Sequence, residues 1–140
     1  MILLDTNVIS ELMRADPAQA VLDWFAKHDA AELFISAVTE SELRTGVAIL
    51  PEGQRRDRLQ MAINAMIDQD LQARILPFDS PAAKAYAEIA DLRRAAGRPI
   101  AEADCQIAAI ARAIGAPVAT RNVKDFDGCG IRLINPWNDQ

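Results

Sequence analysis

Short apolar runs alternate with longer amphipathic segments along the whole chain, and this alternation restricts the fold more than any other feature. The apolar runs are residues 1–4, 33–36, 74–78, 117–119 and 131–134. Strands that alternate with helices form a parallel sheet that is covered by helices on both faces. The pattern therefore predicts an α/β fold. Because no repeat, low-complexity tract or linker interrupts it, we expect residues 1–140 to form one domain.

The segments between the apolar runs have the spacing of amphipathic helices. The first is predicted to begin after Asp16 as N-cap, with Pro17 in the first helical position. The others are residues 37–49, a helix whose apolar face runs from Leu59 to Leu71, residues 79–97 that begin at Asp79, and residues 101–114. Tyr86, Leu92 and Ile114 are expected to face the core, and Gly97 and Gly115 to end the last two helices.

Composition excludes several classes of protein. No run approaches the roughly 20 apolar residues of a membrane span, and Asp5 and Glu11 interrupt any signal-peptide core, so we expect a cytoplasmic protein with no membrane association. The two cysteines, Cys105 and Cys129, are then expected to be reduced. A net charge of −5 argues against indiscriminate polyphosphate binding, but arginines around an acidic centre still permit a nucleic-acid substrate.

Acidic residues are predicted at the carboxyl edge of the sheet, where parallel α/β folds bind ligands. Asp5 ends the first strand, Glu42 lies in the helix after the second strand, and Asp104 lies in the first turn of an otherwise apolar helix. Thr120, Arg121 and Asn122 follow the fourth strand, and Asp125 comes three residues later. Acids that meet at one edge repel one another unless a cation lies between them, and oxygen ligands suit Mg²⁺.

Each of these residues also has a purely structural interpretation. Asp5 is a good N-cap for a helix over residues 7–13, and Thr39 with Glu42 has the spacing of a capping box. Asp104 gains stability from the positive end of its helix, and Asn122 and Asp125 are common turn residues.

Four segments in order resemble the PIN-domain nucleases, and among them the VapC-like toxins that include the FitB type. The segments are LDTNVISEL at 4–12, ISAVTESELRTG at 35–46, GRPIAEADCQIAAIA at 97–111, and TRNVKDF at 120–126 followed by INPW at 134–137. The resemblance spans nearly the whole chain. It implies a PIN-like three-layer α/β/α sandwich with a mostly parallel central sheet of four to five strands.

The resemblance also implies a Mg²⁺-dependent endoribonuclease in which Mn²⁺ substitutes for Mg²⁺. Asp5, Glu42 and Asp104 would form the catalytic centre, with Asp5 and Asp104 as metal ligands. Thr6 and Asn7 would support Asp5, and Thr120 would line the same pocket. Some relatives have a fourth aspartate where this chain has Asn122. Asn122 keeps an oxygen ligand but lacks the negative charge, which puts the binding of a second metal in doubt. Asp125 is a substitute for the missing fourth aspartate.

As partners, the resemblance implies an RNA substrate, a second copy of the chain in a homodimer, and a VapB-like, DNA-binding antitoxin with a basic tail. The charged residues considered for RNA contact are Arg44, Arg55, Arg56, Arg58, Arg121 and Lys124. A run such as Arg55, Arg56 and Arg58 is equally consistent with a solvated helix face.

Two other classes of protein share part of this pattern. A phosphatase with an aspartyl nucleophile would also place an acid at Asp5, but it needs a second aspartate two residues later, where this chain has Asn7. A catalytically degenerate PIN-like binding module is the alternative that Asn122 keeps open.

Overall fold

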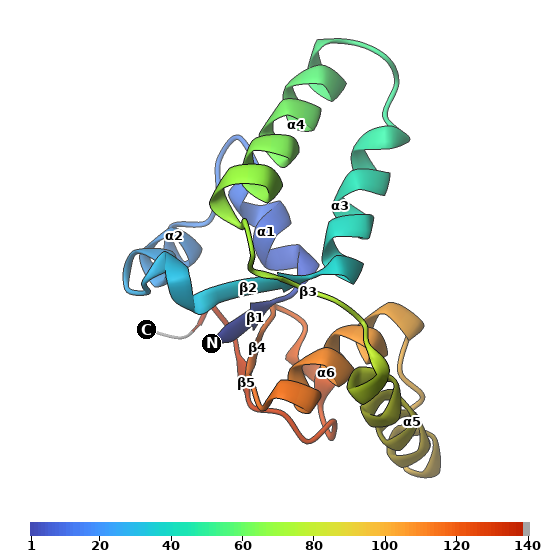
Figure 1. The fold of residues 1–140 in the computed structure, drawn as a ribbon. Helices are drawn as coiled ribbons and strands as arrows, with labels where there is room; N and C mark the ends of the chain where they lie inside the picture. Colours follow the sequence, from blue (N-terminus) through green and yellow to red (C-terminus); the bar gives the residue numbers. More distant parts are fainter. Residues whose placement is uncertain (139–140) are drawn as a thin grey trace.

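The computed structural model describes residues 1–138, in which a parallel sheet lies between two helical layers (Figure 1). The strands are β1 (Ile2–Leu4), β2 (Leu33–Ser36), β3 (Ile75–Leu76), β4 (Val118–Ala119) and β5 (Leu133–Ile134). They form one five-stranded sheet in the order β3-β2-β1-β4-β5, and every pairing is parallel. The predicted α/β sandwich is confirmed, and its outer strands are shorter than the apolar runs suggested.

The helices form the two outer layers. One face of the sheet carries α1 (Thr6–Leu12), α2 (Gln19–Ala26), α3 (Ala37–Ala48) and α4 (Gln54–Ala65), and the other carries α5 (Ser80–Ala95) and α6 (Glu102–Ile114). Short 3-10 turns occupy η1 (Ala30–Glu32) and η3 (Val123–Phe126), and η2 (Met66–Asp70) is a π-helical turn that continues α4. Figure 1 shows α3 and α4 as a hairpin that extends away from the sheet. No helix among residues 1–138 is long and apolar enough to cross a membrane.

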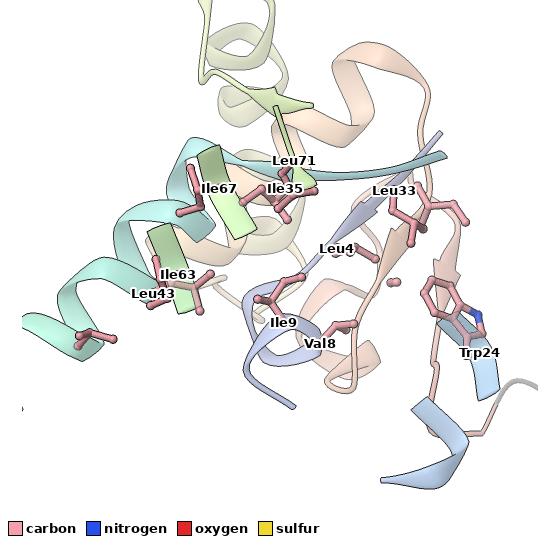
Figure 2. Close-up of a cluster of buried hydrophobic side chains, with 13 residues drawn as sticks. Leu4, Val8, Ile9, Trp24, Leu33, Ile35, Leu43, Ile63, Ile67 and Leu71 are labelled. Atoms are coloured by element: carbon pink, nitrogen blue, oxygen red, sulfur yellow. The ribbon is translucent and has the colours of Figure 1, made fainter. Parts of the chain in front are cut away.

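The central strand β1 packs on both helical layers, as its uninterrupted apolar run predicts. Ile2 and Leu4 belong to the core under α1 to α4, whereas Leu3 belongs to the core under α5 and α6. Figure 2 shows the first of these cores, in which Leu4 and Ile35 of neighbouring strands lie beside helical residues such as Ile9. Because both faces are buried, β1 is held rigidly, and so is the residue that follows it.

The strand order reverses between β1 and β4. From β1 the chain moves outward to β2 and β3, then returns to the other side of β1 for β4 and β5. The loops that leave β1 and β4 therefore diverge to opposite sides and open a crevice at the carboxyl ends of the two strands. The residues after these strands, Asp5 and Thr120, lie at this crevice.

The prediction that Asp16 is the N-cap of the helix now labelled α2 is wrong. The helix begins at Gln19 after Ala18, and no side chain caps it at that residue. The Ala18 N–H instead donates to the carboxylate of Glu11 at 2.8 Å. Glu11 is buried, and its carboxylate binds the N–H that precedes the helix, so a residue of α1 takes the place of the predicted cap. Asp79 is an N-cap as predicted, and Gly97 and Gly115 adopt positive φ where α5 and α6 end.

The predicted inner faces of α5 and α6 are partly wrong. Leu92 and Ile114 are exposed, and Tyr86 is only half-buried. The buried positions of α5 are Ala82, Ala85, Ile89 and Arg93. Ala82 and Ile89 are therefore buried as the apolar spacing predicts, whereas Ala85 and Arg93 take the places expected for Tyr86 and Leu92. The buried guanidinium of Arg93 donates to carbonyl oxygens in the segment after β4.

Candidate active site

Asp5 uses both of its carboxylate oxygens. Oδ1 accepts the Thr6 N–H at 2.7 Å as the N-cap of α1, and Oδ2 accepts the Thr120 hydroxyl at 2.8 Å. Asp5 is therefore the N-cap of α1, as its structural interpretation predicts, and it also binds Thr120. Burial raises the pKa of Asp5, the two hydrogen bonds act in the opposite sense, and the charges of Glu42 and Asp125 add to the rise. Asp5 is only 5% exposed.

Thr120 connects three segments of the site. Its hydroxyl donates to Asp5 and accepts hydrogen bonds from Asn7 Nδ2 at 3.4 Å and from the Asn122 N–H at 3.0 Å. Asn7 in turn accepts the Arg121 N–H through Oδ1 at 3.3 Å. The beginning of α1 and the loop after β4 are thus joined by side chains, and the orientation of Asp5 follows from both.

Glu42 reaches the same crevice from α3. Thr6 Oγ1 donates to Glu42 Oε1 at 2.6 Å and lies 3.0 Å from Thr39 Oγ1. The capping box predicted for Thr39 and Glu42 is wrong, because Ser36 is the N-cap of α3 and accepts the Thr39 N–H at 3.0 Å. The carboxylate of Glu42 is therefore not used to cap its own helix.

Asp104 lies in the first turn of α6, which has no side-chain cap. Burial and the negative charges of Asp5, Asp125 and Glu42 raise the pKa of Asp104 to about 6, against a smaller opposing effect of Arg93. Favourable interaction with the helix end would lower an acid's pKa. The upward shift follows from the loss of hydration and from the repulsion among the acids.

The three acids line one depression, which we call the acidic cleft, whereas Thr120, predicted to line the same pocket, is fully buried and is not among the lining residues. The cleft has a volume of about 450 Å³ and is lined by Asp5, Thr6, Asn7, Ser10, Glu11, Arg14, Glu42, Asp104, Arg121, Asn122 and Trp137. Asn122 lies exposed before η3, where its side chain makes no capping bond. Asp125 is exposed within η3 and is not part of the lining, although its charge raises the pKa of Asp5 and of Asp104.

The oxygens of the acidic cleft suit a divalent cation. Carboxylate, hydroxyl and amide oxygens are hard ligands of the kind that Mg²⁺ prefers. Within residues 1–138 no three acidic, histidine or cysteine side chains are already gathered as a ligand cluster. Mg²⁺ commonly takes one or two carboxylates directly and completes its shell with water. The donor set therefore fits such a cation without a closed protein cage.

The six basic residues considered for RNA contact do not form one patch. Arg44 makes a 2.8 Å ion pair with Glu40 and donates to Asn64 at 3.0 Å, which ties α3 to α4. Arg55 and Arg58 line a second and larger depression of about 900 Å³ between α1, α3 and α4. Arg56 is half-buried on α4 and Lys124 is exposed in η3. Of the six, Arg121 alone lines the acidic cleft.

Four residues of the cleft, Ser10, Glu11, Arg14 and Trp137, were not predicted from the sequence. Glu11 is buried, accepts the Ala18 N–H and pairs with Arg14 at 3.2 Å. The sequence did not indicate that Glu11 would be buried, because its partner, the Ala18 N–H, lies in an irregular loop. Arg14 and Trp137 line the rim. The position of Trp137 after the last apolar run was a usable signal, since residues that follow strands meet at this edge.

Comparison with known proteins shows similarity over nearly the whole chain. Residues 2–128 match the family model of the PIN domain. The chain is 44% identical over 137 residues to the VapC ribonuclease Y4jK of Sinorhizobium fredii, covering 98% of each chain. It is 41% identical to the toxin FitB of Neisseria gonorrhoeae, covering 99% of this chain and 100% of that one. A solved structure of FitAB bound to a DNA fragment superposes with a TM-score of 0.95 at 39% identity, covering 100% of this chain and 98% of that one.

Proposed function

The chain belongs to the PIN-domain family, and on that premise we propose that it is a Mg²⁺-dependent endoribonuclease and the toxin of a type II toxin–antitoxin pair. A 44% identical relative is named a ribonuclease and a 41% identical relative is named a toxin. We propose Asp5, Glu42 and Asp104 as the catalytic acids, with Asp5 and Asp104 as metal ligands.

The electrostatic coupling of the acids carries this proposal. Asp5, Glu42 and Asp104 come from three separate elements and line one cleft, and burial together with the charges of Asp5, Asp125 and Glu42 raises the pKa of Asp104 to about 6. A fold gains no stability by gathering acids that repel one another. The arrangement is explained by a positive ligand that the three oxygens share.

A bound Mg²⁺ would supply charge for the phosphate oxygens and lower the pKa of a coordinated water. Asp5 is oriented for its part by Thr120 and by the Thr6 N–H. Glu42 accepts the hydroxyl of Thr6 at 2.6 Å, and in this proposal it would orient the attacking water and accept its proton. Thr6, Asn7 and Thr120 act as supporting residues that fix the carboxylates, and Asn122 and Asp125 border them from the loop after β4.

The test is incubation of the purified protein with total RNA, with Mg²⁺ and with EDTA, followed by mapping of the cut ends. We expect cleavage with Mg²⁺ or Mn²⁺ and none in EDTA, and none for Asp5→Asn or Asp104→Asn. Asp91→Asn is the matched control, because Asp91 is exposed on α5 and does not line the cleft. Cleavage by either cleft variant would exclude this mechanism. RNA binding without cleavage would favour the degenerate binding module.

We further propose a VapB-like, DNA-binding antitoxin as partner. The depression between α1, α3 and α4 shares Thr6, Ser10, Arg14 and Glu42 with the acidic cleft, so the two are continuous. Its walls include the apolar residues Met13, Leu43, Val47, Leu50, Leu59 and Ile63. An antitoxin tail that lies there would place one of its arginines among the acids, where a guanidinium forms paired hydrogen bonds with carboxylates. We also propose that two copies of the chain form a homodimer and that the protein acts in the cytoplasm.

A further inference from the structure

A tryptophan and an arginine stack at the rim of the acidic cleft. Arg121 Cζ lies 5.0 Å from the ring centroid of Trp137, and both residues line the cleft beside Asp5 and Asp104. Trp137 is half-buried and packs on the core under α1 to α4. Arg121 is exposed, and within residues 1–138 its guanidinium makes no ion pair or hydrogen bond. The proposed metal site requires neither residue.

The sheet itself places this pair. In the parallel pairing of β4 with β5, Ala119 lies beside Ile134, so the residues that follow the two strands emerge together. The Arg121 N–H is held by Asn7 Oδ1 at 3.3 Å. The Trp137 N–H is held by Asn135 Oδ1 at 3.0 Å. The backbone on both sides of the stack is thus fixed by hydrogen bonds.

A second cation lies on the same rim. Arg14 pairs with the buried carboxylate of Glu11 at 3.2 Å, yet its side chain remains 62% exposed. Arg14 and Arg121 are the basic residues among those that line the cleft, whose other charged residues are Asp5, Glu11, Glu42 and Asp104. Among the residues that line the acidic cleft, a polyanion therefore meets positive charge at Arg14 and Arg121.

This combination matches the chemistry of an unpaired nucleotide. Proteins hold single-stranded bases by stacking them on aromatic rings and on arginine planes, and they hold phosphates with arginine. We propose that Trp137, Arg121 and Arg14 form a nucleotide subsite, in which an unpaired RNA base stacks on the Trp137 and Arg121 pair and Arg14 binds an adjacent phosphate. The inference rests on the proposed ribonuclease function and names the substrate class as RNA that is single-stranded beside the cut.

The chain contains two tryptophans, which permits a direct measurement. Trp24 is only 1% exposed and lies in the core, whereas Trp137 lines the cleft. In the Asp104→Asn background, which should not cut RNA, tryptophan emission is recorded during titration with an unstructured RNA hexanucleotide and with an RNA duplex. We expect quenching by the single strand and little by the duplex. Trp137→Phe should abolish the signal while preserving affinity, because phenylalanine also stacks.

Affinity is measured in the same background with a labelled single strand. Arg121→Ala and Trp137→Ala should each weaken binding by roughly five- to thirtyfold, as expected for loss of one base stack. Arg94→Ala removes the same charge from an exposed position of α5 and should have little effect. Equal quenching by duplex and single strand, or unchanged affinity in both alanine variants, would overturn the subsite.

The failure of this inference can be told apart from failure of the proposed function. If wild-type protein cuts RNA with Mg²⁺ and the Arg121 and Trp137 variants keep its kcat/KM, the subsite is wrong and the nuclease stands. If the single strand quenches Trp137 but wild type cuts no RNA, the subsite stands and the nuclease is wrong. Quenching by a basic peptide and not by RNA would overturn the subsite and show that Trp137 and Arg121 bind a protein partner instead.

Discussion

The hydroxyl of Thr120 donates to the carboxylate of Asp5 at 2.8 Å across 115 positions of sequence. The two residues follow β4 and β1, the neighbouring strands at which the sheet order reverses. This bond fixes the orientation of Asp5 and lowers its pKa against the opposing effect of burial. It therefore connects the topology of the sheet with the ionisation of the proposed metal ligand.

Thr120→Val should disable the site while keeping the shape of the side chain. It leaves Asp5, Asn7 and the Asn122 N–H each without one hydrogen-bond partner, at a position that is 0% exposed. We expect the free energy of unfolding to fall by about 1–3 kcal/mol. Affinity for Mn²⁺ should also fall, because the pKa of Asp5 rises further. Denaturant titration and calorimetry measure the two effects. Thr120→Ser keeps the hydroxyl and should retain most metal affinity; equal loss in both variants would contradict the role of the bond.

Asp104→Asn should stabilise the metal-free protein at neutral pH. The pKa of Asp104 is raised from 3.8 to about 6, so the folded state binds this proton more tightly than the unfolded chain does. The free energy of unfolding then falls as the pH rises from about 4 to about 6. In EDTA at pH 8 the variant should melt roughly 3–6 °C above wild type, and the gain should vanish near pH 4. A lower Tm at pH 8 would show that the acid stabilises the fold.

Asn122→Asp should strengthen a weak second metal-binding position. Asn122 lines the cleft together with Asp5 and Asp104, but its amide is neutral and adds no negative charge to the site. A carboxylate there should tighten the weaker of two Mn²⁺ positions, on the order of tenfold, because ligand charge raises affinity. Calorimetric titration with Mn²⁺ measures this change. Two equally tight positions in the wild type would rule the idea out.

Arg93→Met should loosen the loop that carries Asp125. The buried guanidinium donates to the carbonyl oxygens of Arg98 at 2.7 Å, Asp125 at 2.8 Å and Asp127 at 3.0 Å. Methionine fills similar space and leaves these carbonyls without donors, so we expect a loss of about 2–4 kcal/mol in unfolding free energy. Arg94→Met at the exposed neighbouring position should change stability by less than about 0.5 kcal/mol. Similar losses in both variants would refute the specific role of Arg93.

Removal of one tail arginine should release the activity of the complex with its antitoxin. The acids of the cleft attract a guanidinium strongly, whereas the apolar walls between α1, α3 and α4 hold the rest of a tail. The copurified partner should suppress cleavage, and alanine at the inserted arginine should restore it without dissociating the complex. Full inhibition after every tail arginine is replaced would mean that the block arises elsewhere.

The local pattern of the sequence determined the elements and the edge at which the acids lie. The run from Met1 to Leu4 predicted a doubly buried strand, and Asp79 and Gly115 marked helix ends, because periodicity and capping depend on residues three or four positions away. The positions of Asp5 and Thr120 after strands predicted a shared edge. Their catalytic roles stay predictions.

Only the tertiary structure decided which of these residues meet. The strand order places β4 beside β1, which pairs Thr120 with Asp5 and brings Arg121 to Trp137. Arg93 is buried because its carbonyl partners, Asp125 and Asp127, come from a distant segment, which no local spacing encodes. The pKa of Asp104 likewise depends on charges carried by other elements. The burial of a side chain and its Coulomb energy depend on which segments are close in space, so both are determined only when the strands have paired.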